Sequence, residues 1–199
     1  MTTAHPALLP TASQTVGPFL HIGLAPRDRA DIEFDGRTDQ PNRIVVAGTV
    51  VDGDGQPMPD GMVEIWQADA DGRYAHPHDL RSQVADETRS ASGFGRLPTG
   101  LDGGFRFNTV KPGRVPAPDR SLQAPHLVVA VFARGLLQHL STRLYFPDEA
   151  EANAEDFVLR RVPAERRHTL IAEHDGSGGY RWTVILQGPP DRETVFFVL

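Results

Sequence analysis

Short runs of apolar residues, many alternating with polar ones, follow one another from residue 44 onward. A period of two is the pattern of a strand that buries one face. This pattern predicts strands at residues 44–51, 61–68, 105–107, 126–133, 136–146, 180–187 and 194–199. Turn sequences such as Asp52-Gly53-Asp54-Gly55 separate them. Only residues 148–156, acidic and alanine-containing after Pro147, are expected to be helical.

Seven or eight short strands with almost no helix predict an all-β fold, a β-sandwich, over residues 44–199. Residues 1–43 contain too few apolar side chains to form a core of their own. We therefore expect an extended N-terminal arm followed by one β-sandwich domain.

Composition narrows the possible functions. The 199-residue chain contains no cysteine, which excludes disulfides, thiolate nucleophiles and cysteine-ligated metals. Its net charge of -6 argues against a nucleic-acid partner. No apolar run approaches the length of a membrane span, and the N-terminus does not have the pattern of a signal peptide. We expect a cytoplasmic protein that acts on a small molecule or binds another protein.

Three groups of side chains could support chemistry. Tyr74, His76 and His78 follow the predicted strand 61–68, but they also fit a hairpin loop with surface histidines. His126 opens a strand that is apolar on both faces, and it is either a ligand or a hydrogen-bonded core residue. Arg134 follows the same strand and is either an ion-paired surface residue or a carboxylate-binding group, because a guanidinium grips a carboxylate with two parallel hydrogen bonds.

The order of these groups along the chain resembles that of the intradiol ring-cleavage dioxygenases. The resemblance extends from residue 44 to 146 and begins with a Gly-x-Val-x-Asp-x-x-Gly-x-Pro segment at 48–57. It continues through Val-Glu-Ile-Trp-Gln-Ala-Asp at 63–69, Gly-Arg-Tyr at 72–74, Phe-Gly-Arg at 94–96, residues 102–107, Thr-Val-Lys-Pro-Gly at 109–113, His126, and Arg-Leu-Tyr-Phe at 143–146. The opening segment is common among β-sandwich modules, whereas the 66–74 segment and its ordered sequel are specific to the family.

The resemblance implies an iron site that this chain has lost. In the family, two tyrosinates and two histidines hold Fe(III), and a catechol substrate chelates that iron. Tyr74 matches the first tyrosine and His126 the first histidine, whereas Val115 and Val128 occupy the other two positions. We expect no metal and no catalytic residue in this chain, a Tyr74 that stays a neutral, locally hydrogen-bonded phenol, and the cation Arg114 close to the missing second tyrosine.

Such a loss is typical of the alpha chain in two-chain members of the family that cleave 3,4-dihydroxybenzoate with O2 to 3-carboxy-cis,cis-muconate. Residues 11–19, 132–135 and 193–197 also resemble alpha chains. The resemblance implies a beta-subunit partner that binds the Fe(III), a higher-order alpha–beta oligomer, and an arm, 1–43, that contacts the partner. It assigns the lining of the partner's substrate site to Thr15, Gly17, Pro18 and Arg134.

Two other classes of protein share part of this sequence pattern. A homomeric catechol or hydroxyquinol dioxygenase would need metal ligands where Val115 and Val128 stand. A non-enzymatic, transthyretin-like β-sandwich binding module would explain residues 48–57 but not Tyr74, His126 or the arm. The sequence assigns no role to His76 and His78, no conformation to residues 26–42, and no number of alpha–beta units.

Overall fold

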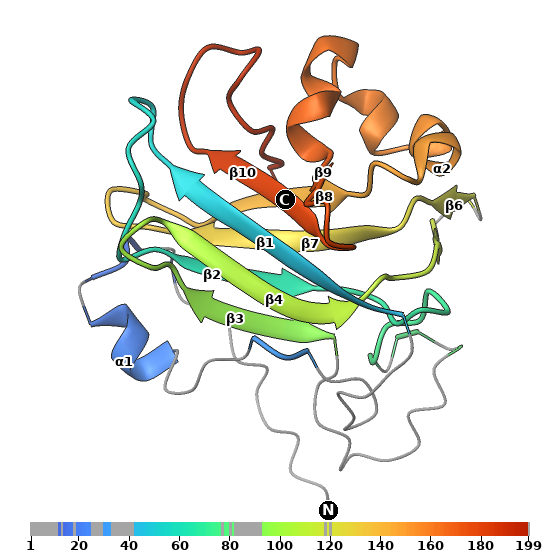
Figure 1. The fold of residues 1–199 in the computed structure, drawn as a ribbon, viewed down its shortest axis with the longest axis horizontal. Helices are drawn as coiled ribbons and strands as arrows, with labels where there is room; N and C mark the ends of the chain where they lie inside the picture. The colour runs from blue at the N-terminus through green and yellow to red at the C-terminus, as the bar shows by residue number, and fades with distance from the viewer. Residues whose placement is uncertain are drawn as a thin grey trace, which may run out of the picture.

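Two four-stranded sheets packed face to face form the body of the protein (Figure 1). This computed structural model describes residues 12, 14–17, 19–24, 30–32, 42–76, 78–79, 81, 93–117, 119 and 121–198. One sheet has the order β4-β1-β10-β9 and consists of β1 (Arg43–Val51), β4 (Gly104–Val110), β9 (Glu173–His174) and β10 (Tyr180–Ile185). The other has the order β3-β2-β7-β8 and consists of β2 (Met62–Trp66), β3 (Phe94–Pro98), β7 (His126–Phe132) and β8 (Leu140–Tyr145). The expected all-β sandwich is confirmed.

The core lies between the two sheets and is filled by the alternating apolar side chains that predicted the strands. Val63 and Ile65 of β2 and Val129 of β7 face Val50 of β1 and Phe107 of β4 in one buried cluster. Their polar neighbours therefore point to the outer faces, where a functional site can form. Strands β1 and β10 pair in parallel, and the other pairs within these two sheets are antiparallel.

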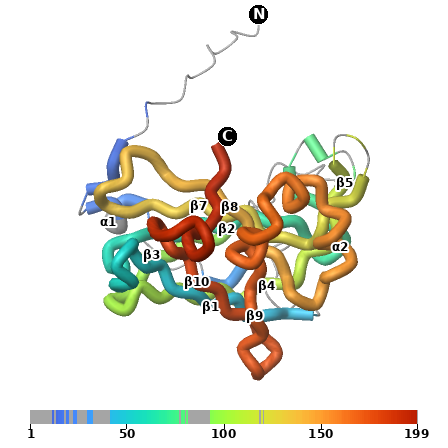
Figure 2. The backbone as a smooth tube through the Cα atoms, turned by 90° about the horizontal axis from the view of Figure 1, so that it is seen from above, coloured from blue at the N-terminus to red at the C-terminus, as the bar shows by residue number. Residues whose placement is uncertain are grey.

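Helical segments cover one end of the sandwich. Helix α2 (Ala150–Glu155) confirms the helix expected at 148–156, and it is followed by the 3-10 segments η1 (Leu159–Arg161) and η2 (Ala164–Leu170), which were not predicted. Together they bury a second apolar cluster that includes Tyr145. A short helix, α1 (Leu20–Leu24), lies in the predicted arm at the opposite end of the sandwich (Figures 1 and 2). No helix in the described ranges is long and apolar enough to cross a membrane.

The chain after β10 differs from the expected strand at 194–199. Thr194 donates its backbone N–H to Ile185 O of β10 at 3.1 Å, and Phe197 donates its N–H to Ser141 O of β8 at 2.8 Å. The segment is therefore hydrogen-bonded to both sheets, and its pairing with β8 is an isolated bridge between Phe197 and Ser141. Residue 199 lies outside the described residues.

Part of the expected arm packs against the domain. The N–H of Ile32 donates to Asn108 O at 2.9 Å on the edge of β4, and Asn108 N–H donates to Ala30 O at 2.7 Å. Ile32 is fully buried, and its Cδ1 would lie 2.1 Å from a Cβ added to Gly95 of β3. The close approach of Ile32 therefore requires a glycine at position 95.

Candidate functional site

The positions that match the family's iron ligands meet on the outer face of the β3-β2-β7-β8 sheet. The register places Trp66 opposite Val128 and Val128 opposite Arg143, which gives one row of side chains across β2, β7 and β8. The next row pairs His126 with Tyr145, whose ring centroids are 5.8 Å apart. Directly opposed residues share a face, so these five side chains form the floor of a common site.

A loop and a two-stranded ribbon build the walls above this floor. The ribbon pairs β5 (Val115–Pro116) with β6 (Leu122–Gln123). The loop that follows β2 packs on the segment before the ribbon through glycines: Gly113 donates its N–H to Asp69 O at 2.9 Å, and a Cβ on Gly72 would lie 2.0 Å from Arg114 O. These contacts bring Tyr74 and Val115 to one open pocket of about 410 Å³, which is also lined by Trp66, His76, His78 and Gln123.

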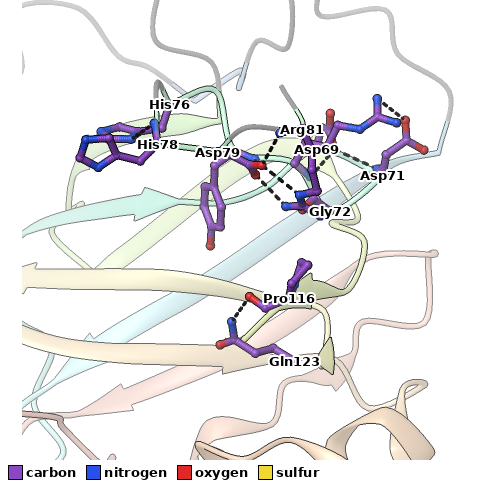
Figure 3. A network of polar contacts seen from close by, with 11 residues as sticks. Asp69, Asp71, Gly72, His76, His78, Asp79, Arg81, Pro116 and Gln123 are labelled. Carbon is purple, nitrogen blue, oxygen red and sulfur yellow. Dashed lines mark hydrogen bonds and ion pairs between the residues drawn. The ribbon is translucent and has the colours of Figure 1, made fainter. Parts of the chain in front are cut away.

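A network of polar contacts fixes the conformation of the loop (Figure 3). Asp79 accepts a hydrogen bond from the backbone N–H of Tyr74 at 2.9 Å and from Arg81 at 2.7 and 2.9 Å. The hydrogen bonds from Arg81 lower the pKa of the Asp79 carboxyl to about 2, so it stays ionised. The rings of His76 and His78 lie 4.9 Å apart, and both residues line the pocket.

Burial governs the titratable groups on the floor. His126 is 2% exposed, and this burial, with the charge of Arg143, lowers its pKa to about 4. Its Nδ1 lies 2.7 Å from Ala124 O, which fits a neutral ring that donates from that nitrogen. His126 is therefore a neutral, hydrogen-bonded core histidine in this chain.

Tyr74 is also held neutral. Burial raises the pKa of its phenol, and the nearby charge of Arg143 offsets only part of that effect. Its ring packs against Trp66 with centroids 4.7 Å apart. The hydrogen bond expected of the phenol is not found among the described residues, where the Tyr74 hydroxyl has no partner. Only the backbone N–H of Tyr74 is bonded, to Asp79 at 2.9 Å.

The cation at this site that no described carboxylate neutralises is Arg143, since Arg81 is paired with Asp79 at 2.7 Å. Its Nη1 donates to Gln123 Oε1 at 2.9 Å and, at 3.4 Å, to the hydroxyl of Tyr145. Burial raises the pKa of Tyr74 and Tyr145 and lowers that of His126. The charge of Arg143 offsets part of the rise at the two phenols and adds to the lowering at His126, so it lies within electrostatic range of all three. No periodic pattern marks Arg143, because it reaches the site only through the pairing of β8 with β7.

Arg114, expected close to the missing second tyrosine, adjoins Val115 but directs its side chain away from it. Arg114 donates from Nη2 to Leu122 O at 2.9 Å and to Glu155 at 3.0 Å, so its charge is directed toward β6 and α2. It follows that Arg143 is the relevant positive charge.

These residues do not fit a ferric ion of the family type. Hydrocarbon side chains occupy two of the four ligand positions, at Val115 and Val128, and valine offers no donor atom. The phenol of Tyr74 and the imidazole of His126 remain, with the cation Arg143 beside them. Within the described ranges, no group of three or more His, Cys, Asp or Glu side chains could hold a metal.

The substrate-lining residues implied by the sequence lie elsewhere. Arg134 lies beyond the far end of β7, a strand that spans about 20 Å from His126 to Phe132, and forms an exposed ion pair with Asp60 at 3.4 Å. Thr15 and Gly17 are exposed, and Gly17 O accepts the first hydrogen bond of α1 from Leu20 at 3.1 Å. Pro18 lies outside the described residues. The structure brings neither Arg134 nor Thr15 nor Gly17 to the pocket of Tyr74.

Comparison with known proteins identifies the class. A sequence model of the family described as Dioxygenase matches residues 16–188. The chain belongs to this family, that of the intradiol dioxygenases.

More particularly, the chain is 44% identical over 201 residues to the protocatechuate 3,4-dioxygenase alpha chain of Burkholderia cepacia, covering 94% of this chain and 96% of the relative. It is 33% identical over 155 residues to the beta chain of the same organism's enzyme, covering 73% of this chain and 65% of that one.

Solved structures share the fold. The 3-chlorocatechol 1,2-dioxygenase of Rhodococcus opacus 1CP superposes with a TM-score of 0.57 at 21% identity, covering 90% of this chain and 68% of that one. At this identity the similarity supports the fold alone.

Proposed function

We propose that this chain is the alpha subunit of a cytoplasmic protocatechuate 3,4-dioxygenase, in which the beta subunit holds the Fe(III). The observation that supports this most directly is the site on the outer face of β7 and β8. Two of the four ligand positions are valine, and Arg143 supplies a positive charge beside the other two. The same observation disfavours a homomeric catechol or hydroxyquinol dioxygenase.

The assembled enzyme would cleave the ring of 3,4-dihydroxybenzoate with O2 to give 3-carboxy-cis,cis-muconate. Bound to the beta subunit, the iron supplies the chemistry that makes the chelated catechol reactive toward oxygen. This chain's contribution would be to line one side of that site and to bind the substrate's carboxylate.

Arg134 is the residue that we propose for carboxylate binding. Its side chain is 64% exposed, and its ion pair with Asp60 is exposed on both sides, so the guanidinium is free to reach a second protein. Thr15, Gly17 and Pro18, immediately before α1, would complete the lining. Helix α1 and the connection between β7 and β8 lie at the same end of the sandwich (Figures 1 and 2), which is consistent with one shared surface.

We further propose that residues 1–43 contact the beta subunit as an arm and that residues 44–199 form the dioxygenase-like domain. Phe19 is 75% exposed beside α1, and Leu137 is 83% exposed in the β7–β8 connection. Large apolar side chains at one end of a molecule favour a protein partner there. Several alpha–beta units would then assemble into a larger oligomer.

The proposal is tested by producing the chain alone and together with its beta partner. We expect the isolated chain to be colourless and inactive, and the assembled enzyme to contain iron, absorb visible light and take up oxygen with 3,4-dihydroxybenzoate. As a matched control, Tyr74→Phe in this chain should leave the iron content and visible band of the assembled enzyme unchanged. Stoichiometric iron and ring cleavage in the pure chain would refute the proposal.

A further inference from the structure

Arg143 differs from the other cations on this side of the molecule because no described carboxylate neutralises it. Arg96 pairs with Glu64, Lys111 pairs with Asp148 at 2.6 Å, and Arg114 pairs with Glu155 at 3.0 Å. Arg143 is half-buried, and its Nε and Nη2 atoms donate to no described residue. A cation removed from bulk water without a partner is costly, so this position favours an anion.

The nearest buried acid cannot serve as that partner. Asp156 lies behind the hydroxyl of Tyr145, which donates to it at 3.1 Å. Its oxygens also accept backbone hydrogen bonds from Ala124 at 2.9 Å, Val158 at 2.9 Å and Leu159 at 2.8 Å. With its acceptor sites occupied, Asp156 fixes the turn into η1 and leaves the outward side of Arg143 open.

The pocket next to Arg143 has aromatic walls. Trp66 remains 40% exposed after packing on Tyr74, so part of its ring is open to the pocket. Gln123 lines the same pocket and accepts the hydrogen bond from Arg143, so the guanidinium lies directly behind the pocket wall. The pocket has a volume of about 410 Å³, and the ion pair of Asp79 and Arg81 lines it together with the aromatic rings and Gln123. Aromatic walls with a few convergent polar groups are typical of a small-molecule site.

We propose that the degenerate iron site of this chain is an anion site, which binds a small aromatic carboxylate between the open face of Trp66 and the guanidinium of Arg143. The aromatic ring stacks on Trp66, and the carboxylate accepts hydrogen bonds from the free nitrogens of Arg143. Val115, at the position of a missing ligand, gives the pocket an apolar wall that suits a ring and not a metal.

The test measures binding of radiolabelled benzoate to the assembled alpha–beta enzyme by equilibrium dialysis. The beta subunit is common to all samples, so any difference reports on this chain. We expect Arg143→Met to weaken the benzoate site of this chain roughly 10- to 150-fold, the range of a lost charge-assisted hydrogen bond. The matched control is Arg106→Met, at an exposed arginine of β4, which should leave binding unchanged. Equal stoichiometry and affinity in the wild-type and Arg143→Met enzymes would overturn the proposal.

Ligand and wall variants test the aromatic part of the proposal. Benzyl alcohol, which lacks the charge, and acetate, which lacks the ring, should both fail to displace benzoate from this site. Trp66→Leu should weaken benzoate binding while the cation remains. If acetate competes as well as benzoate and Trp66→Leu has no effect, the site is not selective for aromatic anions and the proposal is wrong. Should Arg143→Met not assemble, a crystal structure of the wild-type enzyme with benzoate decides: the carboxylate lies beside Arg143, or the inference fails.

Discussion

Replacing Arg134 by alanine should impair catalysis in the assembled enzyme without weakening the fold. Its ion pair with Asp60 spans 3.4 Å, and the two side chains are 64% and 66% exposed, so solvent screens the attraction. Exposed pairs of this kind contribute about 0–1 kcal/mol to stability. A charge-assisted hydrogen bond to a bound carboxylate contributes about 1.5–3 kcal/mol, so kcat/KM for 3,4-dihydroxybenzoate should fall roughly 10- to 150-fold.

The measurement is oxygen uptake with two substrates. Catechol lacks the carboxylate, so Arg134→Ala should change its kcat/KM little. The matched variant is Asp60→Asn, which removes the ion pair but keeps the cation; asparagine also tolerates the positive φ of 60° at this position. We expect Asp60→Asn to retain full activity toward 3,4-dihydroxybenzoate. If Arg134→Ala leaves both substrates unaffected, or lowers both equally, Arg134 does not bind the carboxylate.

Two further predictions concern the degenerate site. Neither Val115→Tyr nor Val128→His should give a ferric visible absorption band, since ionising one phenol at pH 7 costs about 4 kcal/mol. We expect the double variant to stay colourless unless Arg143→Gln is added. Iron binding by the double variant alone would contradict the role of Arg143. His126 has a folded pKa of about 4, below its unfolded value of about 6.5, so the unfolded chain binds the extra proton. The free energy of unfolding should therefore decrease by about 1 kcal/mol per pH unit as pH falls from about 6.5 toward 4, and urea titrations of His126→Gln should lack this component.

The strands that alternate cleanly were predictable from the sequence, and the exceptions have physical causes. Strand β3 was not assigned because Gly95 occupies a buried position, where Ile32 leaves no room for a side chain, and this interrupts the apolar alternation. The 3-10 segment η1 depends on Asp156, whose carboxylate accepts from the N–H groups of Val158 and Leu159. Such a cap is invisible in an apolar pattern.

The site was predictable where it depends on spacing and not where it depends on pairing. Of the four motif positions, Tyr74 and Val115 line one pocket, and His126 and Val128 lie on the outer face of β7. Arg143 was matched only as part of a motif, and the positive charge was assigned to Arg114. Which of two arginines faces the site depends on strand register and on the position of Glu155, and both are set by long-range contacts.

The parallel pairing of β1 with β10 has a consequence for synthesis of the chain. Val46 of β1 pairs in register with Tyr180 of β10, so the middle of one sheet joins segments from opposite ends of the domain. While a ribosome is still making the intervening residues, β1 has only β4 as a neighbour, and its other edge displays unpaired N–H and C=O groups. Strand pairings so distant in sequence form slowly. The nascent chain should therefore depend on chaperones until β10 has emerged, and premature termination before residue 180 should yield aggregates and not a smaller folded domain.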